Sequence, residues 1–354
     1  MGEMTMKALV YHSPHQFSLD EVPVPQIQDP GDAILRVTLA TPCTSDIHIL
    51  EGHIPFVRWP IILGHEFCGE IVELGSAVEG FKVGDRVSCL PGAFCNECVM
   101  CKSGYPSFCL HGGCYGNIKD LHGALAEYVR IPFAAQTMKH IPEGLAEEDV
   151  LLAGDMLGTA WFGITNAEVK KGDSVAVFGV GPVGMCACIL AKKVFEAETV
   201  IAVDLAQYRL DAVLNAGVAD YIINPTEEDA VKRIREITHK RGVNAVVETA
   251  GVQSTMTAAA RSLGIGGILS TISLFAKPLE LPLDLMPNRN LQLRTGIQQC
   301  QGVDTILELI KEGKIDTRFM LTHRSPLNDI INALDIFGGN KDGCIKYLIT
   351  PYEK

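Results

Sequence analysis

The sequence lacks an excess of positive charge, which excludes broad electrostatic attraction to polyanions. Its 354 residues contain 30 lysines and arginines against 42 aspartates and glutamates, so the formal net charge is −12. A surface of that sign repels nucleic acid and anionic membranes. Apolar residues make up 47% of the chain and charged residues 20%, a balance typical of a globular α/β protein. We therefore expect a small-molecule ligand, and neither a nucleic-acid nor a membrane partner.

The sequence also lacks an export signal and an uninterrupted apolar span. Its first residues, MGEMTMKALVY, contain no charged segment followed by an apolar one. Residues 174–191 carry no charge and reach the length of a membrane-spanning helix. However, Gly179, Gly181, Pro182 and Gly184 interrupt this run, which favours a buried strand that turns into a buried helix. Twelve cysteines without an export signal indicate a reducing compartment, so we expect a cytoplasmic protein.

Repeats and low-complexity segments are absent, and the local patterns divide the chain into two domains. Residues 6–158 contain short β-branched segments separated by Gly, Pro and Asp, which predicts a mostly-β domain. From about residue 168, apolar strands alternate with helices, which predicts a doubly wound parallel sheet. The expected strands of this sheet are 174–179, 199–204, 221–224, 245–250, 266–274 and 291–296, and the expected helices between them include 206–216, 227–240 and 254–263.

The C-terminal segment is too short to form a core of its own. It contains two expected helices, 303–313 and 326–338, and a closing strand at 343–349. We expect residues 300–354 to pack onto the mostly-β part, so that residues 1–158 and 300–354 form one discontinuous domain. Residues 159–299 then form the parallel-sheet domain.

Four cysteines lie within fifteen residues, with the spacing C-x2-C-x2-C-x7-C: Cys95, Cys98, Cys101 and Cys109. Four thiolates can bind one zinc ion tetrahedrally at S–Zn distances of about 2.3 Å. Such a shell is full, so this zinc is expected to be structural. Two disulfides or four unrelated thiols are the alternatives. An iron–sulfur cluster is disfavoured because its cysteine run normally carries a Pro after the last Cys or a more distant fourth ligand.

Residues 179–184, with the sequence GVGPVG, match the pattern G-x-G-x-x-G between an apolar strand and a helix. Gly179, Gly181 and Gly184 allow a tight turn and a close approach to a pyrophosphate, whose charge meets the helix N-terminus. The intervening Val180, Pro182 and Val183 complete the predicted dinucleotide-binding loop.

Asp204 stands twenty residues beyond this loop, at the end of the next expected strand. A carboxylate there accepts hydrogen bonds from ribose hydroxyls and repels a 2′-phosphate, which favours NAD over NADP. Leu205 follows it and is expected to contact the same cofactor. Arg209 leaves NADP open, because a guanidinium five residues beyond Asp204 can pair with a phosphate. A glycine turn followed by a surface aspartate is the alternative.

Three other segments carry residues that could bind a second metal ion. The segment CTSDIH contains Cys43, the segment GHE contains His65 and Glu66, and the segment AGDML contains Asp155. By spacing alone each residue is ambiguous. A single Cys is usually a core residue, a lone His is usually hydrogen-bonded in the interior, and Asp155 could cap a helix that begins at Met156.

The combination of these motifs resembles a known family. GHE-x2-G-x5-G-x2-V over residues 64–78 is similar to the zinc alcohol dehydrogenase signature, and GDRV (84–87) and LTHRSPL (321–327) stand at the expected places. The chain resembles the zinc-containing medium-chain alcohol dehydrogenase/reductase family, in particular bacterial secondary-alcohol and polyol dehydrogenases. The resemblance implies a GroES-like catalytic domain and a Rossmann cofactor domain.

The resemblance also implies a catalytic zinc site. Cys43, His65 and Asp155 match the three ligands, and the fourth position stays open for water or an alcohol oxygen. Glu66 matches a carboxylate beside the metal. Ser45 and His48 match a proton relay, although the same segment also fits a capped helix start with a partly exposed histidine.

Two further positions and an activity follow from the resemblance. Thr159 matches a residue that lines the nicotinamide pocket. Lys346 matches a basic residue that reaches the cofactor phosphates, with a solvated lysine on an edge strand as the alternative. Phe56 or Trp59 is expected near the substrate, in a cleft between the domains.

The expected activity is zinc-dependent hydride transfer between NAD and a small, secondary alcohol or its ketone. A polyol, butanediol or threonine-type dehydrogenase is the alternative within the family. A zinc-stabilised binding protein without catalysis is the alternative outside it. Two zinc ions per chain and a homodimer or homotetramer are expected.

Overall fold

The computed structural model describes residues 4–54, 56–117, 121–275 and 277–352, which form two compact units. The first unit consists of Met1–Asp155 and Leu321–Lys354, and the second of Met156–Met320. The sequence-based boundaries at 158 and 300 differ from these, since residues 300–320 lie with the second unit. Close packing explains this placement, because a Cβ on Gly302 would lie 2.8 Å from the indole nitrogen of Trp161.

The first unit is mostly β, as its β-branched segments predict. Its elements in the first stretch of chain are β1 (Thr5–Ser13), β2 (Gln16–Pro23), β3 (Ala33–Thr41), α1 (Thr44–Leu50), β4 (Ile61–Ile62), β5 (Glu66–Leu74), β6 (Arg86–Cys89), β7 (Gly92–Ala93), α2 (Val99–Lys102), β8 (Gly113–Cys114), β9 (Tyr128–Ile131), α3 (Ala134–Thr137), β10 (Met138–His140) and α4 (Glu147–Val150). Within the described residues, the largest sheet has the order β10-β6-β5-β3-β18-β17, and β9 also pairs with β3.

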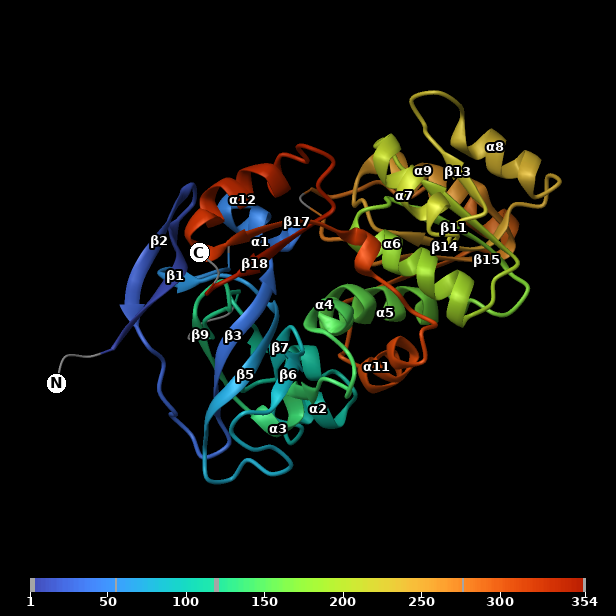
Figure 1. Ribbon diagram of the computed structural model, residues 1–354. Coiled ribbons are helices and arrows are strands. Elements are labelled where there is room, and N and C mark those ends of the chain that lie inside the picture. The colour runs from blue at the N-terminus through green and yellow to red at the C-terminus, as the bar shows by residue number, and fades with distance from the viewer. Residues whose placement is uncertain (1–3, 55, 118–120, 276, 353–354) are drawn as a thin grey trace. The chain divides into compact units, whose positions relative to one another are not determined.

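The C-terminal segment completes this sheet. It contributes β17 (Leu321–Pro326), α12 (Ile330–Gly338) and β18 (Lys346–Thr350). Strand β18 lies between β3 and β17, antiparallel to β3 and parallel to β17, so it is an interior strand (Figure 1). Ile330, Leu334 and Phe337 of α12 belong to the same buried core as Phe67 of β5.

The second unit is built around a parallel sheet. Its elements are α5 (Gly158–Asn166), β11 (Ser174–Phe178), α6 (Pro182–Ile189), β12 (Thr199–Val203), α7 (Gln207–Asn215), β13 (Tyr221–Ile223), α8 (Ala230–Ile237), β14 (Val243–Glu248), α9 (Gln253–Ser262), β15 (Leu263–Thr271), α10 (Met286–Arg289), β16 (Gln292–Thr295) and α11 (Val303–Lys311). In the part of the chain that the structure describes, six strands pair in the order β13-β12-β11-β14-β15-β16, all parallel. This is the expected doubly wound arrangement.

Helices cover both faces of this sheet (Figure 1). Val246 of β14 packs in the core formed with α8 and α9. A Cβ on Gly163 of α5 would contact Val247, the next residue of the same strand. Because neighbouring side chains of a strand point to opposite faces, α5 and the α8–α9 pair lie on opposite sides. Burial on both faces explains the continuous apolar character of β11, β12 and β14.

The ends of α8 are set by local capping interactions and differ from the ends predicted from the sequence. Helix α8 begins at Ala230, not at 227, because the Asp229 side chain caps it by accepting from the Lys232 N–H at 2.9 Å. It ends before His239, which has a positive φ. The uncharged run 174–191 forms β11, the glycine turn and α6, and α6 continues as a π-helical turn over Leu190–Val194. None of the helices in the described ranges is long and apolar enough to cross a membrane.

The carboxylate of Glu248 joins three parts of the second unit at the end of β14. The side chain is fully buried. One oxygen accepts hydrogen bonds from the N–H groups of Ala250 and Gly251 and from the Thr255 hydroxyl, at 2.7–3.0 Å. The other accepts from the hydroxyls of Thr271 and Ser273, both at 2.9 Å. The turn after β14, the start of α9 and the end of β15 therefore depend on one side chain.

We expect Glu248→Ala to lower the free energy of unfolding of the second unit by about 3 kcal/mol, because it leaves buried donors without an acceptor. Glu248→Gln should lose less stability. Its amide oxygen can still accept from the N–H groups of Ala250 and Gly251, and the hydroxyls of Thr271 and Ser273 can rotate to accept from its amide nitrogen. Hydrogen exchange of the β14 and β15 amides measures the effect. Equal protection in the two variants would contradict this role.

Candidate metal and cofactor sites

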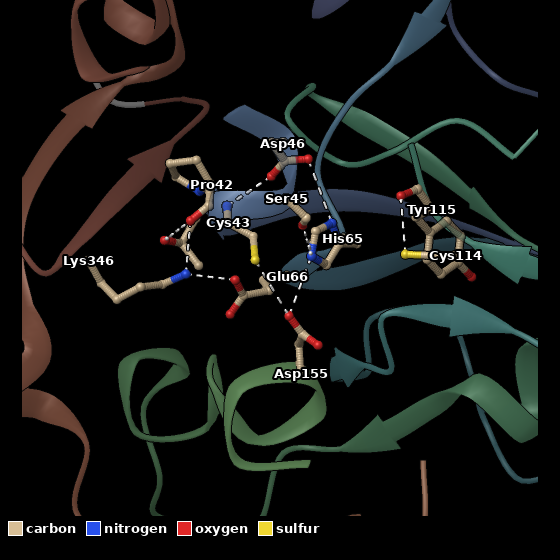
Figure 2. A network of polar contacts seen from close by, with 11 residues as sticks. Pro42, Cys43, Ser45, Asp46, His65, Glu66, Cys114, Tyr115, Asp155 and Lys346 are labelled. Atoms are coloured by element: carbon tan, nitrogen blue, oxygen red, sulfur yellow. Dashed lines mark hydrogen bonds and ion pairs between the residues drawn. The ribbon is translucent and has the colours of Figure 1, made fainter. Parts of the chain in front are cut away.

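Cys43 stands at the N-terminal end of α1, directly after β3. The Asp46 carboxylate accepts a hydrogen bond from the Cys43 N–H at 2.8 Å, which closes the first turn of the helix (Figure 2). Asp46 is fully buried. The helix start therefore holds the Cys43 sulfur in one direction.

His65 lies immediately before β5 and is 6% exposed. Its Nδ1 is 3.6 Å from an oxygen of Asp46. Its Nε2 is 3.4 Å from Asp155 Oδ2 and 3.4 Å from the Ser45 hydroxyl. Asp46 on one side of the ring thus orients the other ring nitrogen toward Ser45 and Asp155 (Figure 2).

Asp155 lies inside a π-helical turn, Ala153–Leu157, just before α5. The alternative that it caps a helix beginning at Met156 is therefore not what the structure shows. The turn places Asp155 Oδ2 3.9 Å from Cys43 Sγ. A π-turn inside a helix is frequent at functional sites, because the extra residue redirects one side chain.

Glu66 and Lys346 form a buried ion pair next to these residues. Lys346 Nζ donates to Glu66 Oε1 at 2.6 Å and to the Pro42 carbonyl at 2.9 Å. Neither side chain is exposed. The expectation of a solvated lysine on an edge strand is therefore wrong, because β18 is an interior strand and its first residue faces a buried carboxylate. The predicted contact of Lys346 with cofactor phosphates stays a prediction.

Burial sets the protonation of this pair. It raises the pKa of Glu66 to about 7, against the opposing effect of the Lys346 cation. Burial alone would lower the pKa of Lys346, but the neighbouring Glu66 carboxylate raises it overall. Lys346 is therefore charged at neutral pH and needs an anionic partner.

The arrangement fits a divalent cation. Cys43, His65, Glu66 and Asp155 each offer one ligand atom, and these atoms lie within 4.8 Å of one another. Burial alone would lower the pKa of His65, but nearby groups, Asp46 and Asp155 among them, raise it well above its usual value, so this site favours positive charge. Glu66 Oε2 is also buried with no hydrogen-bond partner among the described residues. A site that favours positive charge suits a cation, and sulfur, imidazole and carboxylate ligands together suit Zn²⁺.

Sequence reasoning missed two residues of this site. The capped helix start was predicted for the segment that contains Asp46, but the contact of this carboxylate with His65 was not. Cys114 of β8 lies close enough for the charges of His65 and Asp155 to act on its pKa, and no local pattern pointed to it. Burial raises the pKa of Cys114 to about 12, so it stays a thiol and donates to the Tyr115 carbonyl.

The residues of the predicted proton relay lie on α1. Ser45 and His48 are three residues apart, hence on one face of the helix. Burial lowers the pKa of His48, so its imidazole is neutral at neutral pH. The alternative of a capped helix start also describes this segment correctly. Phe56 and Trp59 are 67% and 51% exposed, and Trp59 packs edge-on against Tyr11.

The four clustered cysteines converge in the lobe between β7 and β8. Their sulfurs are 3.5 Å apart for Cys98 and Cys101 and for Cys95 and Cys109, and 4.0 Å apart for Cys98 and Cys109. Zinc–sulfur bonds of about 2.3 Å give a tetrahedron with edges of about 3.8 Å. All four cysteines are free, so the structure does not contain the two alternative disulfides.

Backbone groups support negative charge on these sulfurs. The N–H groups of Cys98 and His111 lie 3.3 and 3.4 Å from the sulfurs of Cys95 and Cys109. Backbone hydrogen bonds, first that of Cys101, lower the pKa of Cys98 to about 6, whereas burial raises the pKa of Cys101 to about 12 and also raises that of Cys109. The lobe therefore fits a structural zinc ion.

The glycine loop of the second unit leaves room for a ligand at one position. A Cβ on Gly184 would lie 1.9 Å from the Gly179 carbonyl oxygen, and Gly179 has a φ of +85°. These two glycines serve the packing of the loop itself. By contrast, no described atom lies within 4 Å of a Cβ built on Gly181, which stands at the N-terminus of α6. With Pro182 in the first turn of the helix, the loop fits a pyrophosphate.

Asp204 lies beside this loop. Its two oxygens accept from the N–H groups of Val180 and Ala206, at 2.6 and 2.8 Å. Leu205 is 68% exposed, and the Arg209 guanidinium stacks over the Tyr208 ring at 5.5 Å. Val183 and Thr159 are half-buried, Val183 in the first turn of α6 and Thr159 in that of α5. The carboxylate keeps lone pairs for ribose hydroxyls, so the loop and Asp204 fit a dinucleotide.

Comparisons with known proteins match these features. A family model described as an alcohol dehydrogenase GroES-like domain matches residues 29–143, and one described as a zinc-binding dehydrogenase matches residues 182–313. An alcohol dehydrogenase of Cupriavidus necator is 34% identical, over 98% of this chain and 99% of the relative. The chain belongs to the zinc-containing medium-chain alcohol dehydrogenase family.

Other members of the family differ in substrate and cofactor. A sorbitol dehydrogenase of Bacillus subtilis is 31% identical, over 98% of this chain and 97% of the relative. The solved structure of alcohol dehydrogenase TADH from Thermus sp. ATN1 has a TM-score of 0.91 at 31% identity, covering 98% of this chain and 99% of that one. Two further solved structures, each with a TM-score of 0.89, hold a nicotinamide cofactor. A dehydrogenase from Escherichia coli CFT073 is complexed with NADH; it is 25% identical, and the match covers 98% of this chain and 99% of that one. A dehydrogenase from Sinorhizobium meliloti 1021 is bound to NADP; it is 27% identical, and the match covers 99% of this chain and 100% of that one.

Family membership confirms several expectations. The GroES-like and Rossmann architecture, the zinc-dependent dehydrogenase class and an NAD(P)-linked oxidoreductase are all confirmed. The roles of individual residues in this alcohol dehydrogenase, the number of zinc ions, the preferred nicotinamide cofactor and the oligomeric state stay predictions.

We expect Lys346→Met to lower the free energy of unfolding of the zinc-loaded dehydrogenase by about 3 kcal/mol, because it leaves the Glu66 carboxylate buried and unpaired. The double variant Lys346→Met/Glu66→Gln should recover part of that loss. Chemical denaturation measures both. As a control, Lys341→Met removes a surface ion pair with Asp335 and should cost less than about 1 kcal/mol. Equal losses in the single and double variants would contradict the pairing.

Proposed function

We propose that this enzyme transfers a hydride between NAD and a small secondary alcohol or the matching ketone. Cys43, His65 and Asp155 bind the catalytic zinc, and Cys95, Cys98, Cys101 and Cys109 bind the structural one. The observation that carries the proposal is the convergence of Cys43, His65, Glu66 and Asp155, whose ligand atoms lie within 4.8 Å of one another, with Glu66 Oε2 left without a hydrogen-bond partner among the described residues. When bound, zinc supplies a Lewis acid for the alcohol oxygen and NAD supplies the hydride acceptor.

Residues of the first unit orient the chemistry. Asp46 holds His65 so that Nε2 faces the site, and the helix start fixes the Cys43 sulfur. Lys346 holds one oxygen of Glu66 and leaves the other unpartnered within the described residues. That free oxygen can approach a cation during turnover, which is the role proposed for Glu66.

A proton must leave the site when an alcohol is oxidised. Ser45, 3.4 Å from His65 Nε2, is placed to hydrogen-bond the alcohol oxygen. His48 lies one turn further along the same face of α1 and carries the proton onward, because its neutral imidazole can accept one.

NAD is the proposed cofactor. Asp204 places a negative charge beside the glycine loop, and a 2′-phosphate of NADP would lie near that charge. The residues proposed to contact NAD are Thr159, Gly179, Val180, Gly181, Pro182, Val183, Gly184, Asp204, Leu205 and Arg209. The buried Lys346 ammonium is held by Glu66 and the Pro42 carbonyl, so we leave it out of this set. The stacking of Arg209 on Tyr208 supports a role for this guanidinium beside the adenine rather than on a phosphate.

A polyol is the second candidate substrate. The relative from Bacillus subtilis named a sorbitol dehydrogenase matches nearly the whole chain, as does the alcohol dehydrogenase of Cupriavidus necator. A zinc-stabilised binding protein without catalysis is disfavoured, because a protein without turnover has no need for an intact set of ligands in a buried, costly arrangement.

We also propose a cellular compartment and an oligomeric state for the enzyme. All twelve cysteines are free, which supports a reducing compartment such as the cytoplasm. A homodimer or homotetramer is the expected assembly.

A substrate panel tests the function. We expect reduction of NAD in the presence of 2-propanol or 2-butanol, with weaker activity on 2,3-butanediol, sorbitol and threonine, followed by the absorbance of reduced nicotinamide. Metal analysis should give two zinc ions per chain. Asp155→Ala should retain one zinc ion and lose turnover, because it removes a ligand of the catalytic site only. Asp335→Ala, an exposed aspartate of the same unit, is the control and should behave as the wild type. No turnover with any of these alcohols would refute the proposed function.

Cofactor preference is tested at Asp204. We expect Asp204→Asn to raise the ratio of kcat/KM with NADP to kcat/KM with NAD by about tenfold or more, because it removes the charge that opposes the 2′-phosphate. The amide oxygen of Asn can still accept from the Val180 N–H, so the loop should keep its shape. Asp204→Gly removes both the charge and the acceptor of the Val180 N–H, so comparison with Asp204→Asn shows what this hydrogen bond contributes. An unchanged ratio in both variants would place the ribose contact elsewhere.

A further inference from the structure

A second group of metal-ligating side chains stands at the C-terminal end of α1. His48, Glu51 and His53 each offer one ligand atom, and these atoms lie within 4.8 Å of one another. They are separate from the set of Cys43, His65, Glu66 and Asp155, and the proposed function gives no role to Glu51 or His53.

The way in which α1 ends brings the two histidines together. Gly52, with a φ of +73°, donates its N–H to the Ile49 carbonyl, and the His53 N–H donates to the His48 carbonyl, both at 2.9 Å. These two bonds define a Schellman motif, in which the residues in the positions of His48 and His53 come into contact. Apolar side chains usually occupy those positions. Here two imidazoles do, with ring centroids 5.8 Å apart.

The group is open to solvent on one side. Glu51 and His53 are 48% and 52% exposed, and Glu51 Oε2 lies 3.2 Å from His53 Nδ1. His48 is more deeply placed, and its Nδ1 is buried without a hydrogen-bond partner in the part of the chain that the structure describes. An ion arriving from solvent therefore meets two exposed ligands first and the imidazole of His48 behind them.

We propose that His48, Glu51 and His53 bind a third divalent cation, Zn²⁺ or an ion with similar preferences, and that this ion inhibits the dehydrogenase by occupying His48. Two imidazoles and one carboxylate suit Zn²⁺ and leave a position for water. This inference rests on the proposed function, because that function assigns the proton relay to His48.

Inhibition follows from the chemistry of imidazole. A neutral ring has one nitrogen that donates and one that accepts. A metal ion on the accepting nitrogen leaves no lone pair for a proton, so His48 can no longer receive one. The site should fill only after the two zinc sites proposed above, since Glu51 and His53 are exposed and lose side-chain freedom on closing around an ion.

Binding is measured directly on the enzyme loaded with two zinc ions. Equilibrium dialysis against increasing Zn²⁺ reports the third ion, and turnover of the best alcohol is assayed at each concentration. The test variants are His53→Asn and Glu51→Gln. The control is His239→Asn, which changes an exposed histidine of the second unit at a positive φ that Asn tolerates.

We expect the wild type and His239→Asn to bind a third ion and to lose turnover in parallel, with activity restored by a mild chelator. His53→Asn and Glu51→Gln should need at least about tenfold more Zn²⁺ to bind the third ion and to lose turnover, because each variant removes one ligand. Unchanged affinity in both test variants would overturn the site. A third ion that binds without loss of turnover would overturn its inhibitory role. Dialysis needs no substrate, so the binding result stands apart from any failure of the proposed alcohol activity.

Discussion

The buried ion pair between Glu66 and Lys346 is the constraint on which the first unit depends. It joins the start of β5 to the start of β18, 280 positions apart in the chain, on either side of β3. A buried charge without a partner costs several kcal/mol, so the charged Lys346 side chain depends on Glu66 in this core. Together with the pairing of β18 with β3 and the packing of α12 in the core, this ion pair holds the C-terminal segment on the N-terminal sheet.

The same carboxylate links the sheet to the metal chemistry. Oε1 of Glu66 is held by Lys346, and the same carboxylate has an oxygen within 4.8 Å of the ligand atoms of Cys43, His65 and Asp155. Each of these three side chains stands where regular backbone begins or is interrupted: a helix start, a strand start and a π-turn. Such positions fix the direction of a side chain without giving up sheet or helix hydrogen bonds elsewhere. A cation held by these side chains would stabilise the folded arrangement, so fold stability and metal affinity are coupled at this site.

Features with short-range signals could be predicted from the sequence. The glycine loop, the four-cysteine spacing and the apolar strands of the parallel sheet were such cases, because each depends on neighbours within a few residues. The burial of Lys346 could not be predicted, since it depends on a partner far along the chain. The second boundary was misplaced for a similar reason: the pattern of α11 shows that one face is buried, but not that Gly302 packs on Trp161. Asp155 lies in a π-turn, for which the sequence carries no simple signal.

Helix α1 connects the metal site to the surface within one short element. Its first turn is closed by Asp46, and its last turn is closed by the two bonds of the Schellman motif, so the two ends are fixed by different interactions. Ser45 and His48 lie between them on one face. Because Gly52 alone carries the positive φ of the motif, the contact between His48 and His53 depends on a residue that does not touch the Cys43 end. A change at the outer end of α1 can therefore alter the proton path while leaving the zinc ligands in place.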